Sequence, residues 1–123
     1  MTRRTAMREP TYFVLASLQR GPLHGYAIIK RAEQLSDGRV RLPTGTLYTA
    51  LDRLSSEGYV ELVHEETVSG RIRRSYGLTG AGSAALLAEA DRLAAAALVV
   101  SRPRAAAPPA GSVPAGSRRV RPA

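Results

Sequence analysis

Hydrogen-bond donors gather on one side of a short central segment, TGTLYTALDRL. Hydroxyl and guanidinium groups can bind the oxygens of an anion such as a phosphate. The candidate anion-binding residues are Thr44, Thr46, Tyr48, Thr49 and Arg53. The leucines between them recur at helical spacing: Leu47, Leu51 and Leu54. The segment therefore predicts a helix with an apolar inner face and an anion-binding outer face.

A second group of donors lies on a predicted β-hairpin. Residues 59–64 alternate apolar and polar side chains, as a half-buried strand does, and residues 71–78 form the other strand. A loop through residues 65–70, which includes two solvated glutamates, joins them. The hairpin carries three arginines: Arg71, Arg73 and Arg74. They could contact phosphate groups, or they could simply keep an exposed strand edge from aggregating.

Two further helices are predicted before the central one. The first begins near Glu9 and ends before Gly21-Pro22. The second runs from about His24 to Leu35, and its predicted buried stripe is Tyr26, Ile28, Ile29, Ala32 and Leu35. In the central helix we expect the Thr44 hydroxyl to cap the first turn, and Gly58 to end the helix.

A fourth helix is predicted over residues 81–100, with Thr79 as its cap. Its apolar residues recur every three or four positions: Leu86, Ala90, Leu93 and Ala97. A terminal helix with so wide an apolar face either folds back on its own domain or pairs with a second copy. A protein with a two-fold symmetric target needs a dimer contact, so we expect these four residues to form one.

The composition bounds the functions that remain possible. The chain has 123 residues, a net charge of +8, two histidines and no cysteine. These counts exclude a disulfide framework and make a metal site improbable, and no catalytic constellation or cofactor fingerprint is present. The chain is therefore expected to be neither an enzyme nor dependent on a cofactor. No targeting signal or membrane-spanning segment is visible, which favours a cytoplasmic protein without membrane contact.

The order of the elements defines the predicted fold class, which is mainly α with a small β-hairpin. Three helices followed by a hairpin indicate a winged helix-turn-helix, in which the third helix lies in the DNA major groove. The predicted parts are a basic arm (residues 1–8), a winged-helix domain (residues 9–80), a dimerisation helix (residues 81–100) and a disordered tail (residues 101–123). The tail contains five arginines and no acidic residue, and could clamp DNA or be idle.

Three motifs resemble those of the PadR family of transcriptional regulators. They are GPLHGYAI (residues 21–28), PTGTLYTALDRLSSEGYV (residues 43–60) and RIRRSYGLTGAG (residues 71–82). The resemblance implies a dimeric winged-helix repressor that binds a pseudo-palindromic operator. It also implies that Tyr48 and the hydroxyl residues before it contact DNA, and that the last helix exchanges with its partner.

The predicted function is sequence-specific binding of double-stranded DNA by a homodimer that represses a nearby gene and is released by a small-molecule effector. One alternative is a winged-helix module for protein interaction, whose affinity for nucleic acid is only non-specific. A specific regulator should prefer its own site over random DNA by about 10³-fold or more, and an interaction module should not.

Overall fold

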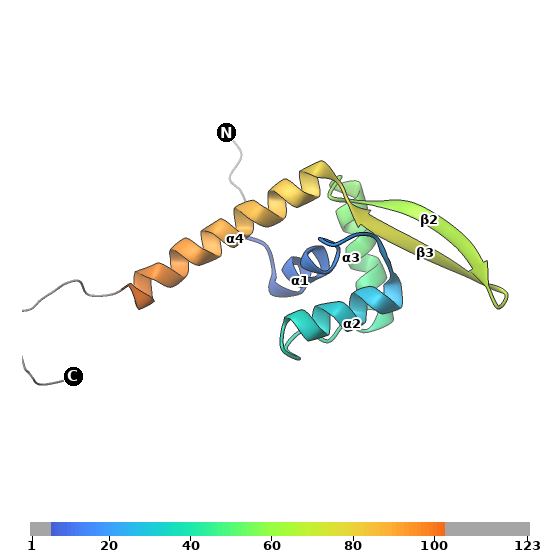
Figure 1. The fold of residues 1–123 in the computed structure, drawn as a ribbon, viewed down its shortest axis with the longest axis horizontal. Helices are drawn as coiled ribbons and strands as arrows, with labels where there is room; N and C mark the ends of the chain where they lie inside the picture. The colour runs from blue at the N-terminus through green and yellow to red at the C-terminus, as the bar shows by residue number, and fades with distance from the viewer. Residues whose placement is uncertain (1–5, 103–123) are drawn as a thin grey trace, which may run out of the picture. The chain divides into compact units, whose positions relative to one another are not determined.

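The computed structural model describes residues 6–102 (Figure 1). The elements in chain order are α1 (Glu9–Ser17), β1 (Leu23–His24), α2 (Gly25–Leu35), α3 (Thr44–Ser56), β2 (Val60–Val68), β3 (Arg71–Leu78) and α4 (Gly80–Ser101). Most of the predicted basic arm and nearly all of the predicted tail lie outside the described residues. The chain divides into two compact units, and the boundary in the sequence falls within α4, after Asp91.

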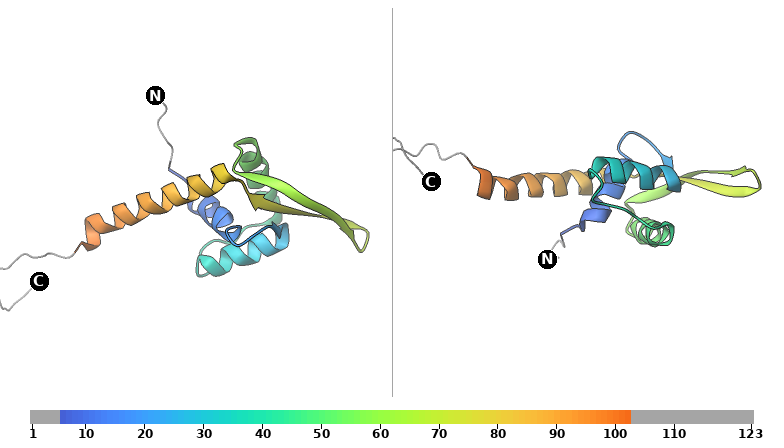
Figure 2. Two further views of the ribbon diagram at one scale, coloured as in Figure 1. Left: turned by 45° about the horizontal axis from the view of Figure 1, so that its top comes forward. Right: turned by 90° about the horizontal axis from the view of Figure 1, so that it is seen from below.

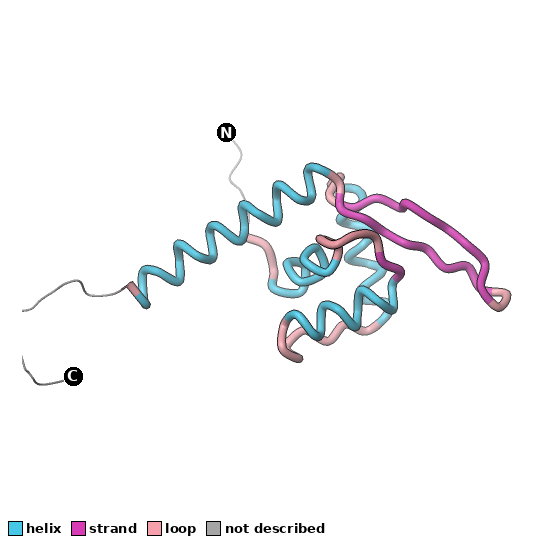
Figure 3. The backbone as a smooth tube through the Cα atoms, in the orientation of Figure 1, coloured by secondary structure: helices cyan, strands magenta, loops and turns pink. Residues whose placement is uncertain are grey.

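The sheet contains one strand more than the predicted hairpin (Figure 3). Its order is β1-β3-β2, and both pairings are antiparallel. The added strand, β1, has two residues, Leu23 and His24, which lie opposite Tyr76 and Ser75. We call the β2–β3 hairpin the wing. β1 leads into α2 and pairs with β3, so it fixes the beginning of α2 relative to the wing.

The hairpin is longer than the sequence predicts, and it extends beyond the helices in each view (Figure 2). Glu65 and Glu66 lie within β2, so their assignment to a loop is wrong. The turn consists of Ser69 and Gly70 alone, with φ angles of 51° and 78°. Positive φ at both positions gives a two-residue turn whose twist matches that of the strands, so pairing continues to the tip.

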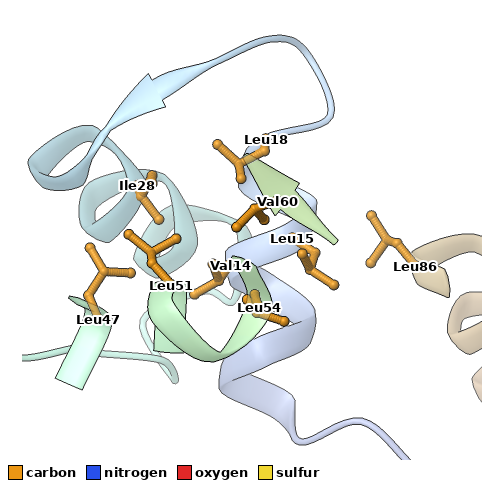
Figure 4. Packing of buried hydrophobic residues seen from close by; sticks show 9 residues of the cluster. All are labelled: Val14, Leu15, Leu18, Ile28, Leu47, Leu51, Leu54, Val60 and Leu86. Atoms are coloured by element: carbon orange, nitrogen blue, oxygen red, sulfur yellow. The ribbon is translucent and has the colours of Figure 1, made fainter. Parts of the chain in front are cut away.

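The core lies where the first three helices meet the base of the sheet (Figure 4). Its buried residues are Val14, Leu15, Leu18, Ile28, Leu47, Leu51, Leu54, Val60 and Leu86. The prediction that the three leucines of α3 face inward is confirmed. Because they recur every three or four residues, they hold one side of α3 against the domain and leave the other side exposed.

The predicted buried stripe of α2 is partly wrong. Ile28 and Ala32 are fully buried, but Tyr26 is 68% exposed and Leu35 is 42% exposed. A helix turns by about 100° per residue, so Tyr26 lies about 200° from Ile28 and points away from the core. Tyr26 is thus a surface residue on the first turn of α2.

The predicted Thr79 cap of α4 is confirmed, whereas the predicted Thr44 cap of α3 is wrong. The His24 side chain accepts a hydrogen bond from the Ala27 amide (3.3 Å), and the Thr79 hydroxyl accepts one from the Gly82 amide (3.0 Å). In α3, however, Pro43 takes the N-cap position and no side chain caps the helix. Thr44 is already the first helical residue, so its hydroxyl is not used by the helix.

The first turns of α4 belong to the first compact unit. Leu86 is only 3% exposed and joins the core beside Leu15 (Figure 4). Its assignment to a dimer surface is therefore wrong, because it already packs within its own domain. No helix in the described part of the chain is long and apolar enough to cross a bilayer.

Candidate nucleic-acid interface

The outer face of α3 exposes four of the predicted anion-binding residues. They are Thr44, Thr46, Tyr48 and Thr49. The opposite face is formed by leucines that are at most 1% exposed. All four side chains are exposed, as predicted, and they spread around the exposed side of α3: at about 100° per residue Thr49 lies opposite the leucines, with Thr46 and Tyr48 on its two flanks.

Tyr48 is held in place by the beginning of α2. Its ring and hydroxyl lie directly over Gly25, the first residue of that helix. A Cβ atom at position 25 would lie 3.0 Å from the Tyr48 Cζ and closer still to its hydroxyl oxygen. Only glycine leaves room for this contact, so Gly25 sets where the Tyr48 hydroxyl can be.

Tyr76 of β3 lies near Tyr48 and connects α3 electrostatically to the wing. Partial burial raises the pKa of the Tyr76 phenol above 10.0, the neighbouring Tyr48 raises it further, and Arg74 opposes both. Tyr48 of α3 and Arg74 of β3 therefore both lie close enough to Tyr76 to affect its ionisation.

Arg53 is separate from the other predicted residues. Its Nη2 donates a hydrogen bond to the Thr11 hydroxyl of α1 (3.0 Å), and its Nη1 lies 3.6 Å from the Glu57 carboxylate. The guanidinium is thus directed along α3 towards α1 and not towards Tyr48. In this structure Arg53 ties the end of α3 to the domain.

The three wing arginines differ in their surroundings. Arg74 Nη2 lies 3.8 Å from the Glu65 carboxylate, and Arg73 Nη1 lies 3.8 Å from that of Glu66. Arg71, next to the turn, forms no ion pair with any of residues 6–102. All three side chains are exposed. The sequence alone does not distinguish these three environments.

Tyr26 was missed as a candidate because it was predicted to be buried. It is the second residue of α2, close to the Gly25 contact, and the Lys30 ammonium lies 5.9 Å from its ring centroid. A phenol and an ammonium on an exposed first turn can both donate to a phosphate oxygen. The signal in the sequence was its spacing of two from Ile28, which places it opposite the buried side.

A hollow of about 980 Å³ lies on another side of the first unit, between α1, the end of α3 and the beginning of α4. We call it the α1–α4 hollow. Alanines of α4 and Leu54 provide its apolar lining, and four charged residues lie among them: Arg8, Arg53, Glu57 and Glu89. Glu89 is only 5% exposed. The described residues contain no group of three or more His, Cys, Asp or Glu side chains arranged to hold a metal ion.

The sequence matches one family model and one curated protein. The model of the transcriptional regulator PadR-like family matches residues 14–88. An uncharacterised 37.1 kDa protein in transposon TN4556 of Streptomyces fradiae is 44% identical over 81 residues, which are 66% of this chain but 22% of that protein. The chain thus spans about a fifth of the length of this curated relative.

Solved structures share the fold. A PadR family regulator from Eggerthella lenta is 26% identical, with a TM-score of 0.62 over 75% of this chain and 78% of that one. Bacillus subtilis PadR, solved in complex with operator DNA, is 24% identical, with a TM-score of 0.57 over 64% of this chain and 45% of that one. Since the family model covers more than half of the sequence, the chain belongs to the transcriptional regulator PadR-like family.

Proposed function

We propose that this chain is a DNA-binding transcriptional regulator that reads the major groove with α3. The observation that carries the proposal is the group of exposed hydroxyls on α3, a helix that buried leucines hold on the domain. Membership of a family of transcriptional regulators supports it. So does the structural likeness to Bacillus subtilis PadR, which was solved with operator DNA.

The exposed residues form three groups, and each group could reach a different part of the DNA. Hydroxyls on the first turns of α3, Thr44, Thr46 and Thr49, and the phenol of Tyr48 are short donors that suit base edges or nearby phosphates. Tyr26 and Lys30 on α2 suit the phosphate backbone beside the groove. The wing arginines reach the backbone or a neighbouring minor groove.

We further propose a homodimer that binds a pseudo-palindromic operator. α4 exposes large apolar side chains that water does not favour: Leu87, Leu93, Leu98, Val99 and Val100. Two copies joined through such a helix place two α3 helices on successive major grooves, which matches the symmetry of a palindromic site. Ala90, Leu93 and Ala97 remain the proposed dimer contacts after Leu86 is assigned to the core.

In this proposal the regulator acts in the cytoplasm as a repressor of a nearby gene, without catalysis, and a small molecule releases it. The α1–α4 hollow supports the effector step, because it is lined both by the proposed DNA-reading helix α3 and by the proposed dimerisation helix α4. Arg53 of α3 and alanines of α4 line the same space. A ligand that displaces the Arg53 guanidinium from Thr11 would therefore alter how α3 is held.

The test is a titration of the full chain with two duplexes of equal length at two salt concentrations. One duplex is selected by the protein from a random-sequence pool, and the other is its scrambled version. We expect a preference of about 10³-fold or more for the selected duplex, which persists as salt rises. Tyr48→Phe and Thr46→Ala should weaken binding to the selected duplex, and Tyr12→Phe, on α1, should not.

Equal and weak binding to both duplexes that disappears at higher salt would contradict the proposal. That result would instead favour a winged-helix protein-interaction module with loose affinity for nucleic acid.

A further inference from the structure

The wing, formed by β2 and β3 (Figure 1), carries two glutamates that face arginines across its strands. The antiparallel register places Glu65 opposite Arg74 and Glu66 opposite Arg73. Each pair brings a carboxylate oxygen to 3.8 Å from a guanidinium nitrogen. Arg71 lies opposite Val68, so no carboxylate faces it across the hairpin.

The two pairs lie on opposite faces of the wing. Neighbouring residues of a strand point to opposite sides, so Arg74 shares a face with Tyr76, and Arg73 shares the other face with Arg71. The influence of both Arg74 and Glu65 on Tyr76 agrees with this assignment. Each face of the wing therefore carries one arginine that is already engaged by a carboxylate.

We propose that Glu65 and Glu66 are specificity-determining residues that restrain the wing arginines from binding DNA indiscriminately. This inference depends on the proposed function, DNA binding. A phosphate that binds Arg73 or Arg74 competes with a glutamate, whose charge lies beside the duplex and repels it. Arg71 is the wing arginine that can bind a phosphate without this competition.

The restraint affects random DNA more than a selected site. Non-specific binding consists almost entirely of phosphate contacts, whereas a selected site adds contacts from α3 to base edges. Removing the carboxylates therefore lowers the ratio of specific to non-specific affinity.

Exposed ion pairs are weak enough for DNA to compete with them. Such pairs contribute about 0–1 kcal/mol, equivalent to at most about a fivefold change in affinity for each pair. The expected effect of removing both carboxylates is accordingly about threefold to tenfold. Each arginine released should also make the slope of log K against log salt more negative by up to about 0.9.

The experiment compares Glu65→Gln/Glu66→Gln with the unaltered full chain on a scrambled duplex and on a duplex selected from a random pool. Glu61→Gln is the matched control. Glu61 is exposed on the same strand but lies opposite Gly77, so its substitution removes one carboxylate, half the charge removed in the double variant, without releasing an arginine. The double variant should bind the scrambled duplex about threefold to tenfold more tightly and with a steeper salt slope, and the selected duplex less than twofold more tightly.

A second comparison tests whether the effect acts through the arginines. In an Arg73→Ala/Arg74→Ala background, the two glutamate substitutions should leave affinity for the scrambled duplex unchanged. The inference is overturned if Glu61→Gln has the same effect, if both duplexes gain equally, or if the gain persists without the arginines. Failure of the proposed function is distinguishable, because the unaltered chain would then show no preference between the duplexes.

Discussion

The Tyr48 phenol rests on the backbone of Gly25, so α3 and the first turn of α2 meet at a point where a side chain at position 25 would displace the phenol. Gly25 itself forms no contact with the outer face through a side chain. It acts by leaving space, and Tyr48 occupies that space. The pair therefore links the HGY motif of α2 to the TLYT motif of α3, which the sequence separates by more than twenty positions.

We expect Gly25→Ala to weaken binding to the selected duplex by about tenfold while the domain stays folded. The added methyl group would overlap the Tyr48 hydroxyl, so the phenol must move from its position over α2. Alanine favours a helix by up to about 1 kcal/mol relative to glycine, which offsets part of the packing cost. Fluorescence anisotropy measures the affinity, and circular dichroism reports whether the fold persists.

Two controls accompany this substitution. Gly80→Ala makes the same change at the beginning of α4, where no atom lies within 4 Å of the added group, and should leave binding unchanged. In a Tyr48→Phe background the effect of Gly25→Ala should become smaller, because the two residues act as one unit. Equal effects in both backgrounds would show that Gly25 acts independently of Tyr48.

Local patterns in the sequence predicted the helices well, and their errors have physical causes. The spacing of the leucines in α3 identified both its buried and its exposed face. Tyr26 was misplaced because an apolar ring was assumed to be buried, whereas its angle around α2 from Ile28 places it outside. Thr44 was misplaced by one position, because Pro43 already adopts the extended backbone of an N-cap.

Contacts between distant elements were beyond the sequence patterns. Arg53 and Thr11 are 42 positions apart, and nothing in either segment signals their hydrogen bond. The strand β1 has two residues, too few to show an alternating pattern. Glu65 and Glu66 were assigned to a loop, and their pairing with arginines became visible only with the register of the hairpin. Residue types in the sequence could thus locate the candidate site residues, but they could not show which side chain each residue contacts.

We expect Thr11→Val to lower the free energy of unfolding by about 1 kcal/mol. Thr11 is 8% exposed and accepts the hydrogen bond from Arg53, so valine leaves the guanidinium without this acceptor. Urea unfolding followed by circular dichroism measures the change. Thr46→Val, at an exposed position of α3, is the matched control for stability.

Urea unfolding of Arg53 variants tests whether Arg53 stabilises the domain through its contact with Thr11. If Arg53 serves to fix α3 on α1, the double variant Thr11→Val/Arg53→Ala should be no less stable than Arg53→Ala alone. Additive losses in the double variant would mean that the two side chains stabilise the domain separately.

We expect Tyr76 to make the domain less stable at alkaline pH. Its pKa is raised above 10.0 in the folded chain, chiefly by burial. As pH rises past 10.0 the unfolded chain therefore loses this proton first, and stability present below pH 10.0 is lost until the folded-state pKa is passed. Tyr76→Phe should remove this part of the pH dependence.

Urea unfolding at a series of pH values from below 10.0 upward measures the effect. Tyr26→Phe is the control, because Tyr26 is an exposed phenol. The interpretation is rejected if Tyr76→Phe and Tyr26→Phe change the alkaline slope by the same amount.

The final prediction concerns the proposed dimer. Leu93 is 41% exposed, and Ala97 lies one turn further along the same side of α4. If a second copy covers this side, Leu93→Glu/Ala97→Glu would bury two unpaired carboxylates at the contact and weaken the dimer by about 100-fold or more. Ala95→Glu is the control, because it lies about 200° from Leu93 around the helix. Sedimentation velocity at several protein concentrations distinguishes the cases: a shift to monomer in the double variant alone supports this side of α4 as the contact, whereas dimers that survive both changes place the contact elsewhere.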